Sequence, residues 1–183
     1  MSNKDDLKNV KNKKIINFHI PRWQELPNLD IYLDQLVTYL ETCLSPYIGS
    51  EDNPVITKTM INNYVKQQVI PPPVKKKYRK EHVASLFVIC ILKQVYSINN
   101  TSILINFAGE TTKLILAYNL FCSELEKAVM AVFNGDEYEI TSGIRIEHKL
   151  LKSVVLSFAH KLYVEKTFLA EKNKELDKQK NND

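Results

Sequence analysis

Apolar side chains recur three and four positions apart along most of this chain, a spacing that predicts packed helices rather than strands. The first such segment follows Asp30, a residue type that caps helices. Its apolar positions are Leu33, Leu36, Val37, Leu40 and Leu44. We therefore expect a helix over Asp30–Leu44. Ser-Pro, Gly-Ser and Asn-Pro pairs then predict a loop over Ser45–Pro54.

A shorter pattern predicts a second helix over Thr57–Gln68, capped by Thr57. Its narrow apolar side contains Ile61, Tyr64 and Val65. The other side and its flanks are polar and carry no acidic residue: Lys58, Thr59, Asn62, Asn63 and Lys66. This helix would therefore bury one stripe and present amides and lysines to solvent.

Pro71-Pro72-Pro73 ends that pattern and forces an extended path, because each ring fixes φ and removes a donor. We expect at most a small β hairpin around Val69–Tyr78, and a short extended piece at Tyr138–Ile140. Asn99–Asn100 predicts a break and Asn134-Gly135 a helix end. Further helices are expected over Arg79–Tyr96, Ser102–Phe107, Thr111–Phe133 and Ile144–Leu169. The predicted fold class is mainly α.

Composition places the chain among ordinary globular proteins, with 44% hydrophobic and 25% charged residues in 183. Its three cysteines, Cys43, Cys90 and Cys122, form no disulfide framework or metal clip, which favours a reducing compartment. The longest apolar run, Val83–Leu92, is far shorter than the roughly 20 residues of a membrane span. We therefore expect a cytoplasmic protein with no membrane partner.

The net charge of +4 is unevenly distributed. Residues 57–80 contain seven basic residues and no acidic one, whereas residues 23–56 contain six acidic residues and no basic one. A positive field this local is typical of a binding face for a polyanion. Solvation of a charged surface is the plainer alternative.

Catalytic and metal-binding patterns are weak. The four histidines, His19, His82, His148 and His160, lack metal-ligand spacing, and no two glycines lie close enough for a phosphate-binding loop. No GxSxG motif is present. We therefore expect no enzymatic activity, no metal and no cofactor. A small enzyme ranks third, behind the two binding functions described next.

Residues 57–80, which contain no acidic residue, carry the kinds of side chain that proteins use to bind duplex DNA. Asn62 and Asn63 can bond base edges, and lysines can neutralise phosphates. Thr57 and Thr59 could present hydroxyls and backbone N–H groups to a phosphate at the helix N-terminus. The predicted DNA-binding residues are Thr57, Lys58, Thr59, Asn62, Asn63, Lys66, Lys75, Lys76, Lys77, Tyr78 and Arg79. Ile61, Tyr64, Val65 and Tyr78 are also expected to fix the helix and the basic strip to the scaffold. The second alternative is a helical adaptor whose basic strip meets an acidic protein partner.

The segment Thr57–Ile70 is similar to the recognition-helix signature of MerR-type winged helix-turn-helix regulators. Matching positions are Thr57 as the cap, Tyr64 as the aromatic residue, Val69-Ile70 and Pro71 as the exit, Tyr78-Arg79 in the wing, and Val83–Tyr96 as the following buried helix. Gln68 stands where that family has its exit glycine. The resemblance implies a recognition helix in the major groove and a basic wing on phosphates.

A second set of positions resembles a bacterial family of unknown function whose YkrK-like members are regarded as transcriptional regulators. It covers about Arg22 to Phe107 and includes Trp23, Leu26-Pro27, Tyr32, Asp34-Gln35, Ile56-Thr57, Met60–Lys66, Pro73, Lys77-Tyr78 and Leu92-Lys93.

We predict a polar segment over 1–20, a winged helix-turn-helix domain with a small β wing over 21–108, and a C-terminal helical region with a charged tail over 109–183. Thr111–Phe133 and Ile144–Leu169 would supply a homodimer interface, or would only complete one core. The operator and any effector stay open.

Overall fold

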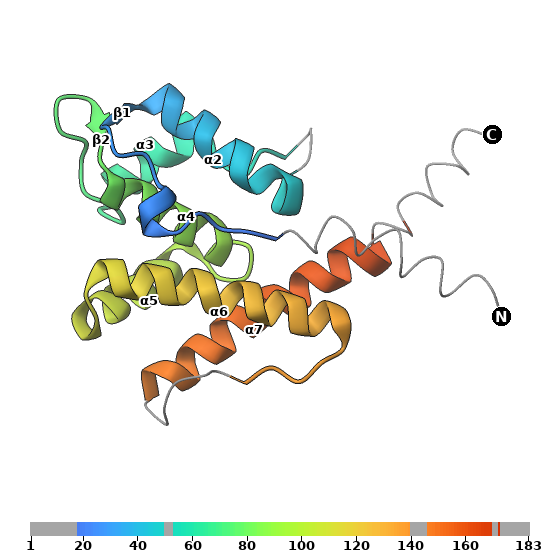
Figure 1. The fold of residues 1–183 in the computed structure, drawn as a ribbon. Coiled ribbons are helices and arrows are strands. Elements are labelled where there is room, and N and C mark those ends of the chain that lie inside the picture. The colour runs from blue at the N-terminus through green and yellow to red at the C-terminus, as the bar shows by residue number, and fades with distance from the viewer. Residues whose placement is uncertain (1–17, 50–52, 140–145, 170–171, 173–183) are drawn as a thin grey trace, which may run out of the picture. The chain divides into compact units, whose positions relative to one another are not determined.

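The computed structural model describes residues 18–49, 53–139, 146–169 and 172 (Figure 1). The described part is mainly helical, as the sequence predicts. Its helices are α2 (Leu33–Ile48), α3 (Lys58–Lys66), α4 (Lys80–Leu92), α5 (Ile98–Thr111), α6 (Leu114–Asn134) and α7 (Ile146–Val164). A 3-10 turn, η1 (Trp23–Glu25), precedes them, and a π-helical turn, η2 (Glu165–Leu169), follows.

The chain divides into two compact units: His19–Glu124, and Leu125–Asp183 together with Met1–Phe18. The division falls inside α6, whereas the predicted boundary between residues 108 and 109 falls inside α5. In the part of the chain that the structure describes, no helix has the length and apolar composition to cross a membrane.

The first long helix begins later and ends later than predicted. Asp30 does not cap it, because Ile31–Tyr32 form a strand, β1, and α2 starts at Leu33. The helix then continues through Pro46 to Ile48. Pro46 has no N–H to donate to the Thr42 carbonyl, so the helix loses that one bond and continues for only two residues beyond it. The Ser-Pro pair therefore does not stop the helix where the sequence predicted. Leu36, Leu40 and Leu44 form its buried face, as predicted.

The two-stranded sheet joins distant parts of the sequence. β1 pairs antiparallel with β2 (Lys77–Tyr78), in a register that places Ile31 opposite Tyr78 and Tyr32 opposite Lys77. The predicted hairpin within Val69–Tyr78 is therefore reduced to one bridge, between Val74 and Lys77. The second strand of the sheet comes from residues before α2, a pairing that local patterns cannot reveal.

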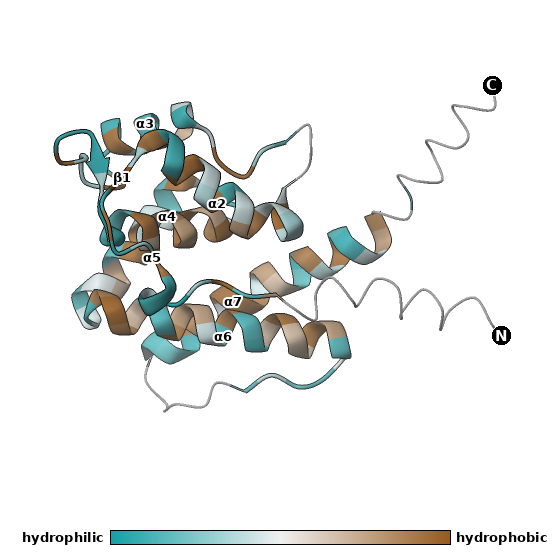
Figure 2. Cartoon of the chain, turned by 45° about the horizontal axis from the view of Figure 1, so that its top comes forward, coloured by the Kyte–Doolittle hydropathy of each residue, from teal (hydrophilic) through white to brown (hydrophobic). Residues whose placement is uncertain are grey.

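The centre of this unit is α4, which is apolar around most of its circumference and largely brown in Figure 2. Its buried side chains include Leu86, Phe87, Ile89 and Cys90, and α2, β2 and α5 all pack on it. It ends at Leu92 rather than at Tyr96. A helix that is hydrophobic on every side is typical of a core element.

The predicted break at Asn99–Asn100 is wrong, because both residues lie in the first turn of α5. Ser97 caps this helix by accepting a hydrogen bond from the Asn100 N–H at 3.2 Å. The helix therefore runs well beyond the predicted Ser102–Phe107. Polar residues are tolerated in a first turn, where backbone N–H groups lack intrahelical partners.

The N-terminal segment of the unit is anchored on the start of α6. The Trp23 N–H donates to Asn119 Oδ1 at 2.8 Å, and the Tyr118 hydroxyl donates to the Pro21 carbonyl at 2.7 Å. The Trp23 ring packs edge-on against Tyr118, and Leu26 is buried. Trp23 and Leu26 therefore anchor this segment on the unit.

In the second unit, the later part of α6 and α7 contribute the buried side chains. They include Leu125, Ala128 and Val129 from α6, and Val154, Val155, Phe158, Ala159 and Leu162 from α7. The α6 helix ends at Asn134, followed by Gly135 at φ +79°, as the Asn-Gly pair predicts. Tyr138 and Glu139 form no strand, and residue 140 lies outside the described residues.

Candidate nucleic-acid interface

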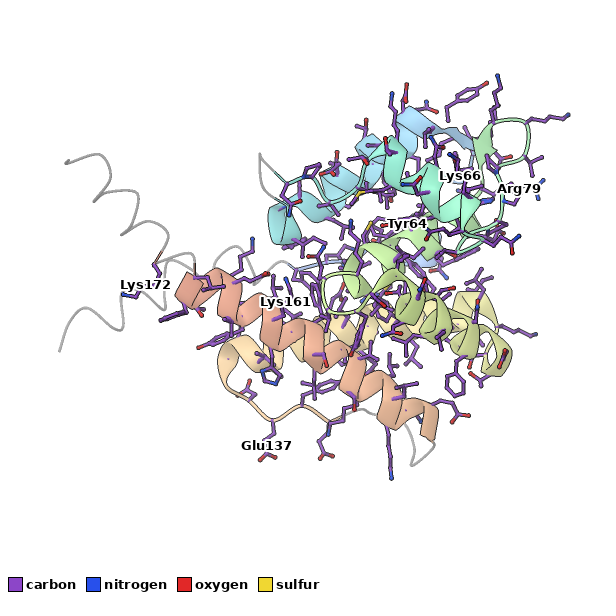
Figure 3. The ribbon with its side chains drawn as sticks, turned by 180° about the vertical axis from the view of Figure 1, so that it is seen from behind. Tyr64, Lys66, Arg79, Glu137, Lys161 and Lys172 are labelled. Carbon is purple, nitrogen blue, oxygen red and sulfur yellow. The ribbon has the colours of Figure 1, made fainter. Side chains whose placement is uncertain are left out.

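Helix α3 separates its side chains into a buried and an exposed face. Ile61 and Tyr64 are buried, and burial raises the pKa of Tyr64. Figure 3 shows Tyr64 on the side of α3 that faces α4, whereas Lys66 is exposed. The predicted polar residues are exposed: Lys58, Thr59, Asn62, Asn63 and Lys66. The structure thus brings the predicted amides and lysines together on one surface.

The N-terminus of α3 is held by its own cap. The Thr57 hydroxyl oxygen accepts a hydrogen bond from the Met60 N–H at 3.1 Å, as predicted for a capping threonine. Lys58 pairs with Asp34 of α2 at 2.5 Å, and both side chains are largely exposed. An exposed ion pair contributes about 0.2–1 kcal/mol and is weakened by salt. The sequence did not reveal this internal partner for Lys58.

Val55 and Ile56, just before α3, are held by two charged side chains that the sequence did not indicate. Glu41 accepts a hydrogen bond from the Ile56 N–H at 2.8 Å. Lys93 donates to the Val55 carbonyl at 2.5 Å, and burial lowers the pKa of Lys93. Val55 and Ile56 are themselves buried. The start of α3 is therefore tied to both α2 and α4, and only the family-like Leu92-Lys93 pair hinted at this.

The exit of α3 is a left-handed turn made without glycine. Gln68 adopts φ +57°. Its N–H bonds to the Val65 carbonyl at 3.1 Å, and the Val69 N–H bonds to the Tyr64 carbonyl at 2.9 Å. This pair of bonds is the Schellman motif, which usually places glycine at the left-handed position. The turn that the resemblance assigns to a glycine thus forms on Gln68.

Two of the predicted phosphate-binding lysines form the tip of a tight turn. Val74 and Lys77 exchange two backbone hydrogen bonds, at 3.0 and 2.9 Å. Lys75 and Lys76 between them have φ +50° and +64°. Positive φ at both central positions defines the type I′ turn, which favours Asn-Gly. The turn therefore exposes two adjacent ammonium groups. It also holds both lysines in the left-handed backbone conformation, which is unfavourable in free energy for any residue with a Cβ atom.

The remaining basic residues of the segment are partly engaged by neighbours. Lys77 Nζ lies 5.1 Å from the centroid of the Tyr32 ring, and Lys80 Nζ donates to Asn28 Oδ1 at 2.7 Å. Arg79 is exposed, and Figure 3 shows it directed away from the ribbon. Lys66, Lys75, Lys76 and Arg79 are thus the exposed basic side chains of the segment for which no such contact is seen among the described residues.

Tyr78 is an anchor rather than a contact surface. Its side chain is 3% exposed, and its ring meets the edge of His82 at 5.5 Å between centroids. His82 Nδ1 accepts the Arg79 N–H at 3.0 Å, which caps the start of α4. The predicted DNA contact by Tyr78 does not fit this burial, whereas its predicted role in fixing the wing does.

The described residues also bear on two other kinds of chemistry, a metal site and a reactive thiol. Among the described residues, no group of three or more His, Cys, Asp or Glu side chains is placed to hold a metal ion. Cys90 is fully buried, and burial raises its pKa to about 12. A thiol of that kind is a core residue, not a nucleophile.

Comparison with known protein families gives one match. A family model described as a domain of unknown function, DUF1836, matches residues 21–121. The chain belongs to the DUF1836 family. The DUF1836 region starts just before η1 and ends within α6, so it contains α3, β2 and every candidate residue above. No curated protein and no solved structure matches the chain.

Proposed function

We propose that this DUF1836 protein is a sequence-specific DNA-binding transcription regulator with a MerR-like winged helix-turn-helix. The observation that carries the proposal is the acid-free exposed face of α3 beside a lysine-tipped turn. In this arrangement α3 enters the major groove, and the segment 71–80 lies on the flanking phosphates. No catalytic group or cofactor is required, and we place the activity in the cytoplasm.

The base-reading part of the proposal rests on Asn62 and Asn63. A side-chain amide can bond N6 and N7 of adenine together, a contact worth about 1–3 kcal/mol of discrimination. Both side chains are exposed, while Ile61 and Tyr64 hold the helix from behind. A helix fixed in this way keeps the amides in one position, which base readout requires.

The phosphate-binding part rests on Lys66, Lys75, Lys76 and Arg79. No ion pair of these four side chains is seen among the described residues, so no acidic partner has to be displaced before they meet a phosphate. Strained backbone such as that of Lys75 and Lys76 clusters at functional sites. Lys58 would first have to leave Asp34, so we assign it a smaller share of the affinity.

The connection between α2 and α3 departs from a standard helix-turn-helix, whose turn has three or four residues. Here residues 49–57 lie between the helices. The bonds from Glu41 and Lys93 compensate for this length, because they hold residues 55 and 56 against α2 and α4. We therefore propose that α2, α3 and α4 bind DNA as one rigid unit.

We further propose that the protein acts as a homodimer, because a two-fold protein matches a palindromic operator. The predicted interface along α7 needs revision. Val154, Val155, Phe158 and Leu162, which form most of that stripe, are already buried in the single chain. These four side chains of α7 therefore complete a core, and a homodimer interface on this helix would use its exposed apolar side chains instead, such as Tyr163 and Val164.

One observation favours the alternative of a protein-interaction adaptor. Leu29, Tyr32 and Val74 are 81%, 53% and 42% exposed; Val74 begins the lysine turn, Tyr32 lies opposite Lys77 in the sheet, and Leu29 precedes that strand. An acidic partner with apolar side chains could cover such a surface. Retention on DNA resin with a steep salt dependence would favour DNA, whereas saturation by one protein partner would favour the adaptor.

The proposal is tested by selecting duplexes from a randomised pool with the full chain. We expect enrichment of a motif with two-fold symmetry. Asn63→Ala should then reduce the ratio of affinities for the selected and a scrambled duplex by about tenfold, while Asn134→Ala, an exposed amide on α6, leaves it unchanged. An unenriched pool, or equal losses on both duplexes, would contradict sequence-specific readout by α3.

A further inference from the structure

Three side chains form a row on the outward face of the small sheet. Lys77 lies opposite Tyr32 of β1, and on its other side it forms the bridge with Val74 at the lysine turn. Residues directly opposite each other in an antiparallel pair project from the same face of the sheet. The other face carries Ile31 and Tyr78, and Tyr78 is buried. Val74, Lys77 and Tyr32 therefore share one solvent-facing surface, which we name the sheet row.

The sheet row holds its lysine in place. Val74 and Tyr32 are exposed, whereas Lys77 between them is only partly exposed. Lys77 Nζ lies 5.1 Å from the centroid of the Tyr32 ring, within the range of a cation–π contact. A lysine flanked in this way covers its aliphatic stem with apolar neighbours and keeps its charge at the surface. The ammonium group is therefore positioned before any ligand arrives.

The backbone of Tyr32 is fixed by two further contacts. Its N–H donates to Gln35 Oε1 at 2.9 Å, and the residue pairs with Lys77 in the sheet. Two residues later, Asp34 forms the ion pair with Lys58, the first residue of α3. The segment that carries Tyr32 is therefore joined to the lysine turn through the sheet and to the start of α3 through Asp34. This places the sheet row beside both parts of the proposed DNA-binding surface.

The sheet row presents two donors that suit a phosphate. Tyrosine hydroxyls and lysine ammonium groups both bond phosphate oxygens in protein–DNA complexes. A phosphate that accepts a hydrogen bond of about 2.8 Å on each side can join two donors several ångströms apart. Lys77 Nζ is within that reach of the hydroxyl on the Tyr32 ring. One ammonium group beside a neutral hydroxyl matches the single negative charge of a backbone phosphate.

We infer that Tyr32 and Lys77 together bind one phosphate of the DNA backbone. The inference rests on the proposed function, because this phosphate belongs to the duplex that α3 reads. It adds a contact residue from the segment 23–56, in which every charged residue is acidic. Val74 supports the contact by covering the Lys77 stem and does not itself bind phosphate.

The first test removes the hydroxyl and keeps the ring. Tyr32→Phe in the full chain should weaken binding of a labelled random duplex about three- to tenfold in fluorescence anisotropy, because one hydrogen bond to phosphate is lost. The slope of log affinity against log salt should not change, since no charge is removed. Tyr163→Phe, at a tyrosine of α7 that is 40% exposed, is the control and should bind as the wild type does. Both variants should keep the wild-type Tm.

The second test asks whether the two side chains bind the same phosphate. Lys77→Ala should weaken binding and make the salt slope shallower by about 0.9, the contribution of one phosphate. Tyr32→Phe combined with Lys77→Ala should cost less affinity than the product of the two single losses, because groups that share one partner are coupled. Single losses that multiply fully in the double variant would overturn the shared contact.

The outcomes distinguish failure of the phosphate contact from failure of DNA binding. A wild-type chain that binds no duplex would overturn the proposed function and the Tyr32–Lys77 contact with it. Wild-type binding that Tyr32→Phe leaves unchanged would overturn the contact alone. A loss of affinity in Tyr32→Phe that accompanies a lower Tm would assign the hydroxyl to folding, which also overturns the contact.

Discussion

At the scale of single residues, backbone strain is concentrated where function is proposed. Among the described residues, the non-glycine positions with positive φ are Gln68, Lys75 and Lys76, and all three lie within 57–80. The sequence indicates a turn after α3 and a turn after the prolines. It could not indicate these conformations, because lysine and glutamine carry no signal for left-handed backbone. The exposure of Asn62, Asn63 and Lys66, in contrast, follows directly from helical spacing.

Replacing the strained glutamine should stabilise the fold. Gln68→Gly removes the strain of a left-handed residue with a Cβ atom, about 1–2 kcal/mol. Glycine also gives the unfolded chain more conformational freedom, which offsets part of this gain. We therefore expect the free energy of unfolding to rise by up to about 1 kcal/mol in urea titrations. The matched control is Gln67→Gly, at φ −83°, where glycine relieves no strain and should lower stability. Equal effects of the two substitutions would contradict the assigned backbone.

At the scale of elements, local patterns succeed and long-range contacts do not. Five of the six helices were predicted to within a few residues at most of their ends, since their apolar spacing is regular. The partner strand of β2 was missed, because β1 (Ile31–Tyr32) lies far before β2 (Lys77–Tyr78) in the chain. The bonds from Glu41 and Lys93 to residues 55 and 56 were missed for the same reason. These contacts, not the helix pattern, position α3.

The tie from Glu41 can be tested on its own. Glu41→Ala leaves the buried Ile56 N–H without its acceptor, which costs about 1–3 kcal/mol. We expect the Ile56 amide to lose protection in hydrogen exchange and DNA affinity to fall with it. Glu41→Gln keeps a carbonyl acceptor and should retain most of the protection. A protected Ile56 amide in the alanine variant would show that the hydrogen bond does not fix the connection.

At the scale of the whole molecule, charge distribution points to the interface more clearly than any motif. All seven charged side chains of residues 57–80 are basic. The exposed ones lie on α3, on the 74–77 turn and at Arg79. The sequence therefore located the candidate surface. It did not show which charges are already engaged, as Lys58 is with Asp34 and Lys77 with Tyr32, because those pairs depend on packing between elements.

The central claim is that the lysine turn and α3 hold DNA phosphates. The most direct measurement is the slope of log affinity against log salt for a labelled random duplex, taken by fluorescence anisotropy. Each phosphate contact contributes about −0.9 to this slope, so Lys75→Ala/Lys76→Ala should make it shallower by nearly 2 and weaken binding equally on all sequences. Lys127→Ala/Lys149→Ala removes the same charge from exposed positions on α6 and α7 and should leave the slope unchanged. Equal slopes for wild type and the Lys75/Lys76 variant, or equal losses in both variants, would contradict the proposed interface.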